Sequence, residues 1–383
     1  MRPQIKPALH RIWRDPGTLQ VGLDPDHALV LTGLDPALAS VVDSLTGVRT
    51  EEALVTQAVA RGGSGAGARR LLRLLAEGGA LDDAGQSRDG AVPGLGPAER
   101  ERLRPDLAAR SVADGSLDGG VATLRSRREA RIAVFGAGRV GASIITLAAS
   151  SGVARVIVDD RTPTGPGDLA PAGLFAADVG TPRGEGAARA AALAAPSTEV
   201  TTVRPGHPLE RPDLAVIAPD DEPDRRMADA FVRAGLPHLF VRMREGRAIL
   251  GPFVLPGASS CIRCHDLRRT AQDPRWPSVL AQALTTPRGA GACDVVLATT
   301  LASHAVLHVL AFLEGGQPRS VDATLEMDLP YGSVRRRSWS AHPACGCQFD
   351  PERDAGNAGA VEDGPRPSAP PADVRTDPAP KAA

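Results

Sequence analysis

Short, mostly apolar runs alternate with helix-like segments through residues 129–350, and this alternation predicts the architecture of the larger part of the chain. Four runs have the length and composition of buried strands, and they lie at residues 132–135, 155–158, 214–218 and 238–241. Helical patterning is clearest at residues 140–149 and 224–234. Strands that alternate with helices pair in parallel, so the sequence predicts an α/β fold with a Rossmann-like, doubly wound, mostly parallel sheet.

Residues 1–85 show a different pattern. Two short apolar runs, residues 19–23 and 28–31, are separated by a polar four-residue segment, which favours a β-hairpin. Three amphipathic helices are expected after it, two of them beginning at Asp35 and Thr50 and the third running over residues 69–76. A hairpin with three short helices is typical of a winged-helix-like α+β module, which we expect to be a separate recognition domain.

A module of this kind binds either DNA or a peptide. Arg69, Arg70 and Arg73 on the third helix could contact phosphates, although basic residues on an amphipathic helix more often form a solvated face. A peptide could instead add a strand along the hairpin edge, which needs only exposed backbone groups and a few pockets. The sequence leaves both alternatives open.

Two polar segments flank the predicted α/β domain at residues 129–350. Residues 86–128 are rich in Gly, Asp, Ser and Arg and are expected to be a linker. One helix is expected within it, at residues 97–103, and Pro105 is expected to interrupt that helix. Residues 351–383 contain almost no large apolar side chains and are predicted to be a disordered tail.

The longest apolar stretch covers residues 292–313. It contains Asp294, Ser303, His304 and His308, which favours a buried core helix over a membrane span. The two histidines lie four residues apart, a spacing that can bind a metal, but core or interface positions are the better interpretation on so apolar a helix. No membrane partner is therefore expected.

Charge and cysteine usage narrow the class of protein. The formal net charge of −1 at pH 7 gives no electrostatic case for nucleic acid or an anionic membrane as the main partner. No apolar run follows the basic residues at the N-terminus, so no signal peptide is expected. In a large chain of this kind, the five cysteines favour metal binding over disulfides, and the expected location is the cytoplasm.

A glycine-rich turn follows the strand predicted at residues 132–135. Gly136, Gly138 and Gly141 have the spacing of a nucleotide-binding turn, in which the backbone approaches a phosphate at the start of a helix. Asp159 and Asp160 end the next strand about 20 residues later, where a carboxylate can accept hydrogen bonds from ribose hydroxyls. This order predicts a nucleotide site, and these residues do not decide between NAD and ATP.

Four of the five cysteines form two close pairs. Cys261, Cys264, Cys345 and Cys347 supply the four thiolates that structural zinc prefers, and their separation would fasten the end of the domain to its middle. The alternative is two unrelated pairs of reduced cysteines. Cys293 opens the apolar helix and could be an activated nucleophile, but a small buried residue is the better interpretation because no His or Asp partner is evident.

Because the glycines, the acidic pair and the cysteines follow one another in this order, residues 129–350 resemble the ThiF/MoeB-like family, the bacterial relatives of ubiquitin-activating enzymes. The resemblance assigns Gly136, Gly138 and Gly141 to the turn and Asp160 to the ribose. It places Arg183 at a lysine position, Asp220 as a magnesium ligand and Arg225 at the arginine five residues further on. It implies ATP with magnesium as cofactor, structural zinc, a homodimer, and adenylation of a small protein or peptide.

The sequence departs from the family pattern in the middle of the domain. Where the family has Asn-Leu-x-Arg-Gln, this chain has Asp168-Leu169-Ala170-Pro171-Ala172. The missing arginine would stabilise charge on a transferring phosphate, and a proline cannot replace it. Arg139 also stands where the family usually has a further glycine. These departures favour a non-catalytic core.

A ThiF-like domain with altered catalytic residues behind a winged-helix-like module resembles the leader-peptide-binding partner of azoline-forming cyclodehydratases. That resemblance implies capture of a precursor's leader as an added strand and presentation to a separate YcaO-type enzyme that uses ATP. The alternative is an active adenylyltransferase that uses Arg183, Asp220 and Arg225. An NAD-dependent oxidoreductase would explain the glycines but not the cysteines, and a DNA-binding regulator would rest on the first module alone.

Overall fold

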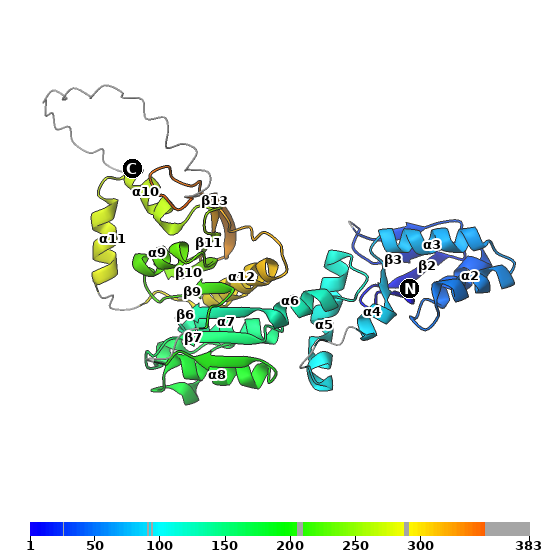
Figure 1. The fold of residues 1–383 in the computed structure, drawn as a ribbon, viewed down its shortest axis with the longest axis horizontal. Helices are drawn as coiled ribbons and strands as arrows, with labels where there is room; N and C mark the ends of the chain where they lie inside the picture. The colour runs from blue at the N-terminus through cyan, green and yellow to red at the C-terminus, as the bar shows by residue number, and fades with distance from the viewer. Residues whose placement is uncertain (26, 90–91, 93–94, 205–209, 287–290, 349–383) are drawn as a thin grey trace, which may run out of the picture. The chain divides into compact units, whose positions relative to one another are not determined.

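The structure is a computed structural model that describes residues 1–348 except 26, 90–91, 93–94, 205–209 and 287–290 (Figure 1). The side chains of residues 87–89 are also not described. Residues 1–348 form one compact unit. The tail predicted at residues 351–383 lies outside the described residues, as does one residue of the predicted hairpin loop.

The N-terminal module is built on a small antiparallel sheet and three helices. The sheet has the order β2-β3-β4, from strands β2 (Arg11–Asp15), β3 (Thr18–Val21) and β4 (Leu29–Leu31), and β1 (Pro3–Ile5) pairs with β5 (Leu81–Asp83). Helices α1 (Pro36–Asp43), α2 (Glu51–Ala60) and α3 (Gly65–Glu77) each begin at a side-chain N-cap, from Asp35, Thr50 and Ser64. The predicted hairpin and three helices are confirmed, whereas β1, β2 and β5 were not predicted.

Three helices occupy the segment expected to be a linker: α4 (Ala84–Asp89), α5 (Pro97–Asp114) and α6 (Val121–Glu129). The prediction that Pro105 interrupts the helix is wrong, because α5 continues through it. A proline inside a helix costs about 3 kcal/mol, and tertiary contacts on both sides of it offset that cost. Leu103 packs against Leu124, while Ser111 is hydrogen-bonded in a buried cluster with Lys6 and Asp82.

The core of the chain is one mixed sheet of eight strands in the order β13-β12-β11-β10-β9-β6-β7-β8. The parallel part contains β6 (Arg131–Phe135), β7 (Arg155–Asp159), β8 (Glu199–Thr202), β9 (Leu214–Ile217) and β10 (His238–Arg244). An antiparallel extension follows, of β11 (Arg247–Val254), β12 (Ala323–Asp328) and β13 (Ser333–Ser338). The predicted α/β class and its four strands are confirmed, and the antiparallel half is an addition.

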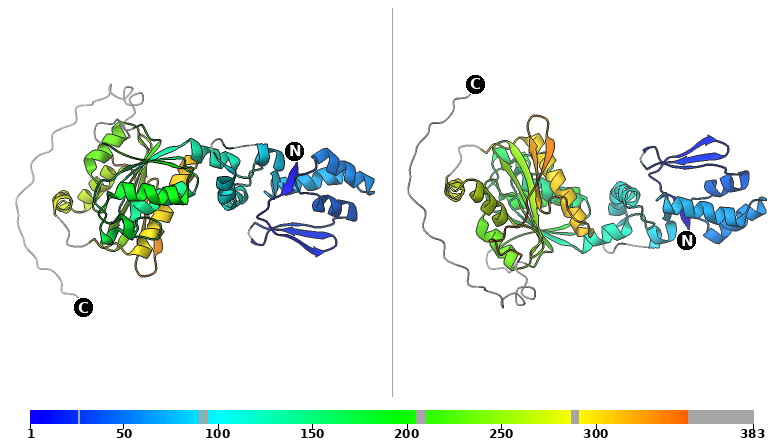
Figure 2. Two further views of the ribbon diagram at one scale, coloured as in Figure 1. Left: turned by 90° about the horizontal axis from the view of Figure 1, so that it is seen from below. Right: turned by 90° about the horizontal axis from the view of Figure 1, so that it is seen from above.

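Helices cover both faces of this sheet (Figures 1 and 2). Helices α7 (Arg139–Ser150), α8 (Arg183–Ala194) and α12 (Val295–Leu313) contribute to the main hydrophobic core on one face. Helices α9 (Arg225–Arg233) and α10 (Ile262–Gln272) pack on the other face around Phe240, and α11 (Trp276–Thr285) follows α10. The strand β10 therefore contributes side chains to two separate environments, because successive residues point to opposite faces.

Helix α12 is the one helix among the described residues that is long and apolar enough to cross a membrane. Its buried residues, which include Leu297, Leu301 and Val309, pack in the core against α7 and the sheet. The same helix exposes Val296 and Leu307 on its other side. The buried side of α12 therefore packs as predicted for a core helix.

Candidate functional site

Three glycines shape the turn between β6 and α7, and the backbone around Gly136 and Gly141 leaves no room for a Cβ at either. Gly136 has φ +96°, and a Cβ there would lie 2.3 Å from the carbonyl oxygen of Ala218. A Cβ on Gly141 would lie 2.0 Å from the oxygen of Gly136, and one on Gly138 would lie 2.4 Å from Oδ1 of Asp220. Gly136 therefore lets the turn lie directly against the end of β9, and Gly141 lets the turn fold closely on itself.

This turn lies where the chain order of the sheet reverses. Strand β6 has β7 and then β8 on one side, and the chain crosses back from β8 to place β9 on the other side of β6. Ligands of open α/β sheets bind in the crevice at the carboxyl ends of such strands. A cavity of about 270 Å³ occupies this place, and the polar and charged side chains that line it include Arg139, Asp168, Arg183, Asp220, Asp221 and Cys293. We call it the switch-point cavity.

Arg183, the first residue of α8, is held by carboxylates on several sides. Its Nε and Nη2 donate to the two oxygens of Asp168 at 2.9 and 2.6 Å, and its Nη1 donates to Asp220 at 2.6 Å. A third carboxylate, of Asp160, lies 3.8 Å from Nη1. Burial alone would lower the pKa of Arg183, but the hydrogen bonds and charges of Asp168 and Asp220 raise it above its ordinary value.

Asp160 supports the glycine turn in this structure. Its carboxylate accepts hydrogen bonds from the backbone N–H groups of Ala137, at 2.7 Å, and Thr162, at 2.9 Å. The carbonyl oxygen of Asp159 accepts from the N–H of Gly136 at 3.1 Å. Both acidic residues at the end of β7 therefore lie beside the turn, and Asp160 holds its backbone in place.

Arg139 reaches from the first position of α7 across the switch-point cavity. Its Nη1 donates to the carbonyl oxygen of Cys293 at 2.6 Å, which ties the start of α12 to the glycine turn. Burial raises the pKa of the Cys293 thiol above its ordinary value, although the charge of Arg139 opposes this. Cys293 is thus half-buried, not fully buried as predicted, and it is a neutral thiol at pH 7, which is not the state of an activated nucleophile.

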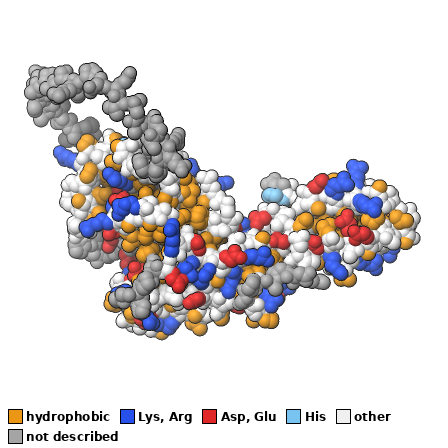
Figure 3. Space-filling model, in the orientation of Figure 1, with side chains coloured by type: hydrophobic (Ala, Val, Ile, Leu, Met, Phe, Trp, Pro, Cys, Tyr) orange, Lys and Arg blue, Asp and Glu red, His pale blue; other side chains and the backbone are white. Residues whose placement is uncertain are grey.

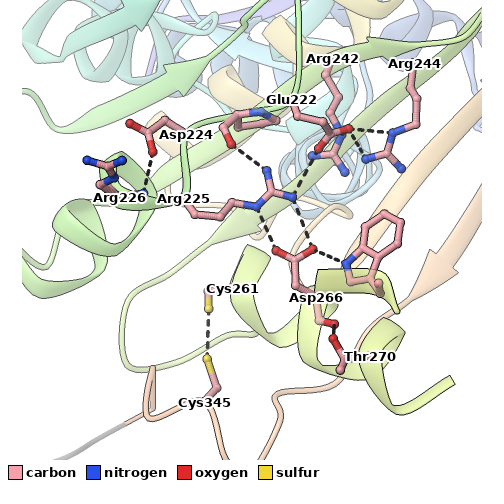
Figure 4. Close-up of polar contacts among 12 residues, drawn as sticks. Glu222, Asp224, Arg225, Arg226, Arg242, Arg244, Cys261, Asp266, Thr270 and Cys345 are labelled. Carbon is pink, nitrogen blue, oxygen red and sulfur yellow. Dashed lines mark hydrogen bonds and ion pairs between the residues drawn. The ribbon is translucent and has the colours of Figure 1, made fainter. Parts of the chain in front are cut away.

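The structure does not bring Arg225 to the cavity. Its guanidinium donates to both oxygens of Asp266, at 2.9 and 3.3 Å, and to Glu222 at 3.3 Å (Figure 4). It also donates to the carbonyl oxygen of Pro223 at 2.7 Å. Asp220 and Arg225, five residues apart, are therefore engaged in different clusters.

The four paired cysteines do come together. The thiol sulfurs of Cys261, Cys264, Cys345 and Cys347 all lie within 4.8 Å of one another. Cys261 and Cys345 are 3.5 Å apart, and Cys264 and Cys347 are 3.3 Å apart. Tetrahedral zinc with bonds of about 2.3 Å places its sulfurs about 3.8 Å apart, so the set fits structural zinc. Among the described residues, this is the one group of three or more such side chains close enough for a metal.

Among the described residues, the two histidines of α12 belong to no group that could hold a metal ion. Nδ1 of His308 lies 2.6 Å from the hydroxyl of Ser320, and burial lowers the pKa of His308 to about 4. His308 is therefore a neutral, hydrogen-bonded residue beside the core.

The model of the ThiF family matches residues 114–348. Because this is more than half of the chain, the chain belongs to the ThiF family. No curated protein matches the sequence.

Solved structures extend the similarity to nearly the whole chain. Escherichia coli MccB with ATP has a TM-score of 0.67 at 15% identity, covering 91% of this chain and 100% of that one. The microcin C7 biosynthetic enzyme MccB in complex with N-formylated MccA gives the same TM-score and coverage at 16% identity. PaaA gives a TM-score of 0.63 at 15% identity, covering 87% and 99%. At these identities the similarity is one of fold.

Sequence reasoning missed two features of the site. The role of Asp168 in holding Arg183 was not predicted, because only the arginine lost at Pro171 was considered in that segment. A cluster of guanidinium groups around Glu222 was also missed. Its signal was present, since Arg242 and Arg244 alternate with apolar residues in the otherwise buried strand β10.

Proposed function

We propose that this protein binds the leader of a ribosomal precursor peptide through its N-terminal module. The bound peptide is then presented, in the cytoplasm, to a separate YcaO-type enzyme for azoline formation. Support comes from the fold similarity to MccB, which covers the N-terminal module as well as the core, and from the record of MccB in complex with MccA. In this proposal, the ThiF-like core acts as a scaffold.

The edge strand β4 is the proposed binding surface for the leader. Within the described sheet of the module, β4 pairs with β3 alone, so its other side can accept an added strand. Val30 of β4 is 40% exposed, and Leu74 of the neighbouring helix α3 is 38% exposed. Leu29 of β4 lies beside Gly78 at the end of α3, so strand and helix together form an apolar border.

The observation that carries the scaffold role is the charge in the switch-point cavity. Arg183 is neutralised there by Asp160, Asp168 and Asp220, all within 3.8 Å. A triphosphate would meet this excess of carboxylates, and its attraction to Arg183 is already offset by Asp168. Pro171 stands where the resemblance would place the arginine that stabilises a transferring phosphate.

The test is peptide binding to the full chain, measured by isothermal titration calorimetry with candidate leader peptides. Val30→Glu is expected to weaken binding by roughly tenfold or more, because it places a charge on the exposed face of β4, beside the added strand. Val59→Glu is the matched control, since Val59 is a 56% exposed valine on α2, outside the proposed surface. Binding of no leader encoded beside the gene, or equal loss in both variants, would contradict the proposal.

The second candidate is an adenylyltransferase that activates the C-terminus of a peptide with Mg-ATP. It is favoured by the cavity at the sheet's switch point and by the record of MccB with ATP. In this role the turn of Gly136, Gly138 and Gly141 would face the phosphates and Asp220 would hold magnesium. Peptide-dependent pyrophosphate exchange that Asp220→Ala abolishes would establish it over the scaffold role.

A further inference from the structure

A buried arginine with two nitrogens that make no hydrogen bond to the described residues lies on the face of the sheet opposite the switch-point cavity. Arg242 on β10 is 3% exposed, and neither its Nε nor its Nη1 has a partner among the described residues. Its nearest carboxylate oxygen, Oε1 of Glu222, is 4.0 Å from Nε, beyond hydrogen-bond range. A buried guanidinium in this state is strongly destabilising, which makes a missing partner the natural explanation.

The charges around Arg242 do not balance. Glu222 accepts hydrogen bonds from Arg244 and Arg225, and Asp266 accepts from Arg225, so both nearby carboxylates are already engaged (Figure 4). We define the guanidinium cluster as these two carboxylates and five arginines, which are Arg225, Arg242, Arg244, Arg269 and Arg337. Positive charge therefore exceeds negative charge in a largely buried place.

Aromatic rings complete the cluster. The guanidinium carbon of Arg269 lies 4.7 Å from the ring centroid of Trp276, and that of Arg337 lies 4.7 Å from the centroid of Trp339. His265 stacks on Trp339 at 4.2 Å, and its buried Nε2 also has no hydrogen-bond partner among the described residues. Three buried nitrogens of one cluster, two on Arg242 of β10 and one on His265 of α10, thus have no hydrogen-bond partner in the part of the chain that the structure describes.

An internal water would not resolve this arrangement. Water can accept hydrogen bonds from Arg242, but it carries no charge and leaves the excess of guanidinium groups uncompensated. Burial and the neighbouring arginines lower the pKa of Arg242 to about 9, so the group is still cationic at pH 7. A negatively charged oxygen group would supply both the acceptors and the compensating charge.

We propose that the guanidinium cluster is a second ligand site, which binds an oxyanion, a carboxylate or a phosphate group, against Arg242. Arg244, Arg269 and Trp276 are partly exposed and form its rim. The site is separate from the switch-point cavity, because Met243 lines that cavity while Arg242, the residue before it, points to the other face of the sheet. It does not depend on the role proposed for the N-terminal module.

The experiment is thermal unfolding of the full, zinc-loaded chain with inorganic phosphate or glutarate, compared with chloride at equal ionic strength. A ligand present at ten times its dissociation constant is expected to raise Tm by about 3 °C. Arg242→Met is expected to abolish the increase. Arg247→Gln is the matched control and retains it, because Arg247 pairs with Asp328 on the neighbouring strand outside the cluster.

The two ligands distinguish the sources of the oxyanion. An increase with glutarate alone assigns the site to carboxylates, and one with phosphate alone assigns it to phosphates. No increase with either ligand, or an equal increase in Arg242→Met, would overturn the proposal. If Arg242→Met fails to fold, Arg269→Met at the rim replaces it, with the increase expected to fall to half or less.

Discussion

Two charged clusters receive side chains from one loop and have opposite balances of charge. After β9, Asp220 joins the switch-point cavity, while Glu222, two residues later, joins the guanidinium cluster. In the cavity, Arg183 is surrounded by three carboxylates. In the cluster, Glu222 is shared by three arginines. The loop therefore distributes acidic groups to opposite faces of the sheet.

The contrast shows that arginine behaves according to its partners and not its burial alone. Carboxylates raise the pKa of Arg183 in spite of its desolvation. Burial and like charges lower the pKa of Arg242 to about 9. The cavity is thus satisfied by the chain's own residues, whereas the cluster is incomplete without an added anion. On the face shown in Figure 3, acidic and basic side chains are interspersed.

Removal of zinc is expected to have the largest effect of the changes considered, because it should disturb the guanidinium cluster. The metal would hold α10 through Cys261 and Cys264, and α10 also carries Asp266 and Arg269 of the guanidinium cluster. Chelation is expected to lower Tm by roughly 10 °C or more, because metal binding is coupled to folding. Differential scanning calorimetry with and without chelator measures it. Cys293→Ser is the control and should not change metal content; a chelator-insensitive Tm would contradict the zinc assignment.

Glu222→Gln should show how much the cluster depends on its shared carboxylate. Burial opposes ionisation, but the charges of Arg242 and Arg244 lower the pKa of Glu222 to about 2. A lowered pKa stabilises the fold above the ordinary value of 4.5, and this contribution is lost as pH falls toward 2.

The difference in unfolding free energy between wild type and Glu222→Gln should therefore be about 3 kcal/mol at pH 7 and about half of that at pH 3. Urea unfolding at both pH values measures it. Glu245→Gln, a substitution in the turn between β10 and β11, is the control for the lost charge. A difference that does not change with pH would mean that Glu222 is not held ionised by its arginines.

Asp168→Asn should bring the charge balance of the switch-point cavity closer to that of the guanidinium cluster, because it releases Arg183 from one of its carboxylates. Affinity for Mg-ATP is expected to rise roughly tenfold, because one negative charge near the phosphates is removed. Equilibrium binding of a fluorescent ATP analogue measures the change. Asp106→Asn on α5 carries the same change of charge and should leave affinity unaltered. Unchanged affinity in Asp168→Asn would mean that this carboxylate does not limit nucleotide binding.

The sequence predicted those parts of the molecule that depend on local pattern. The glycine turn, the four apolar strands and the cysteine set follow from spacing and hydrophobic runs. Strand β13 was missed because all of Ser333–Ser338 is exposed, so the segment has no pattern of buried residues. Its strand conformation comes from pairing with β12. Helix α5 was cut short at Pro105 because its stabilising contacts come from residues far away in the chain.

The charge balance of the two clusters could not be predicted in the same way. Arg183 and Asp220 were predicted as site residues, but their partner Asp168 was noted only as a departure from a family pattern. Arg225 was assigned to the same site by its spacing, and the fold turns it toward Asp266, 41 residues away. Which acid pairs with which base depends on the side of the sheet that each residue faces.

Helix α12 is a rigid connection between two ends of the domain. At its start, the carbonyl oxygen of Cys293 is held by Arg139 of the glycine turn. At its other end, Glu314 forms ion pairs with Arg110 of α5 and Arg127 of α6. A helix of 19 residues is about 28 Å long and resists compression, so the connecting helices and the glycine turn are kept at a fixed mechanical separation.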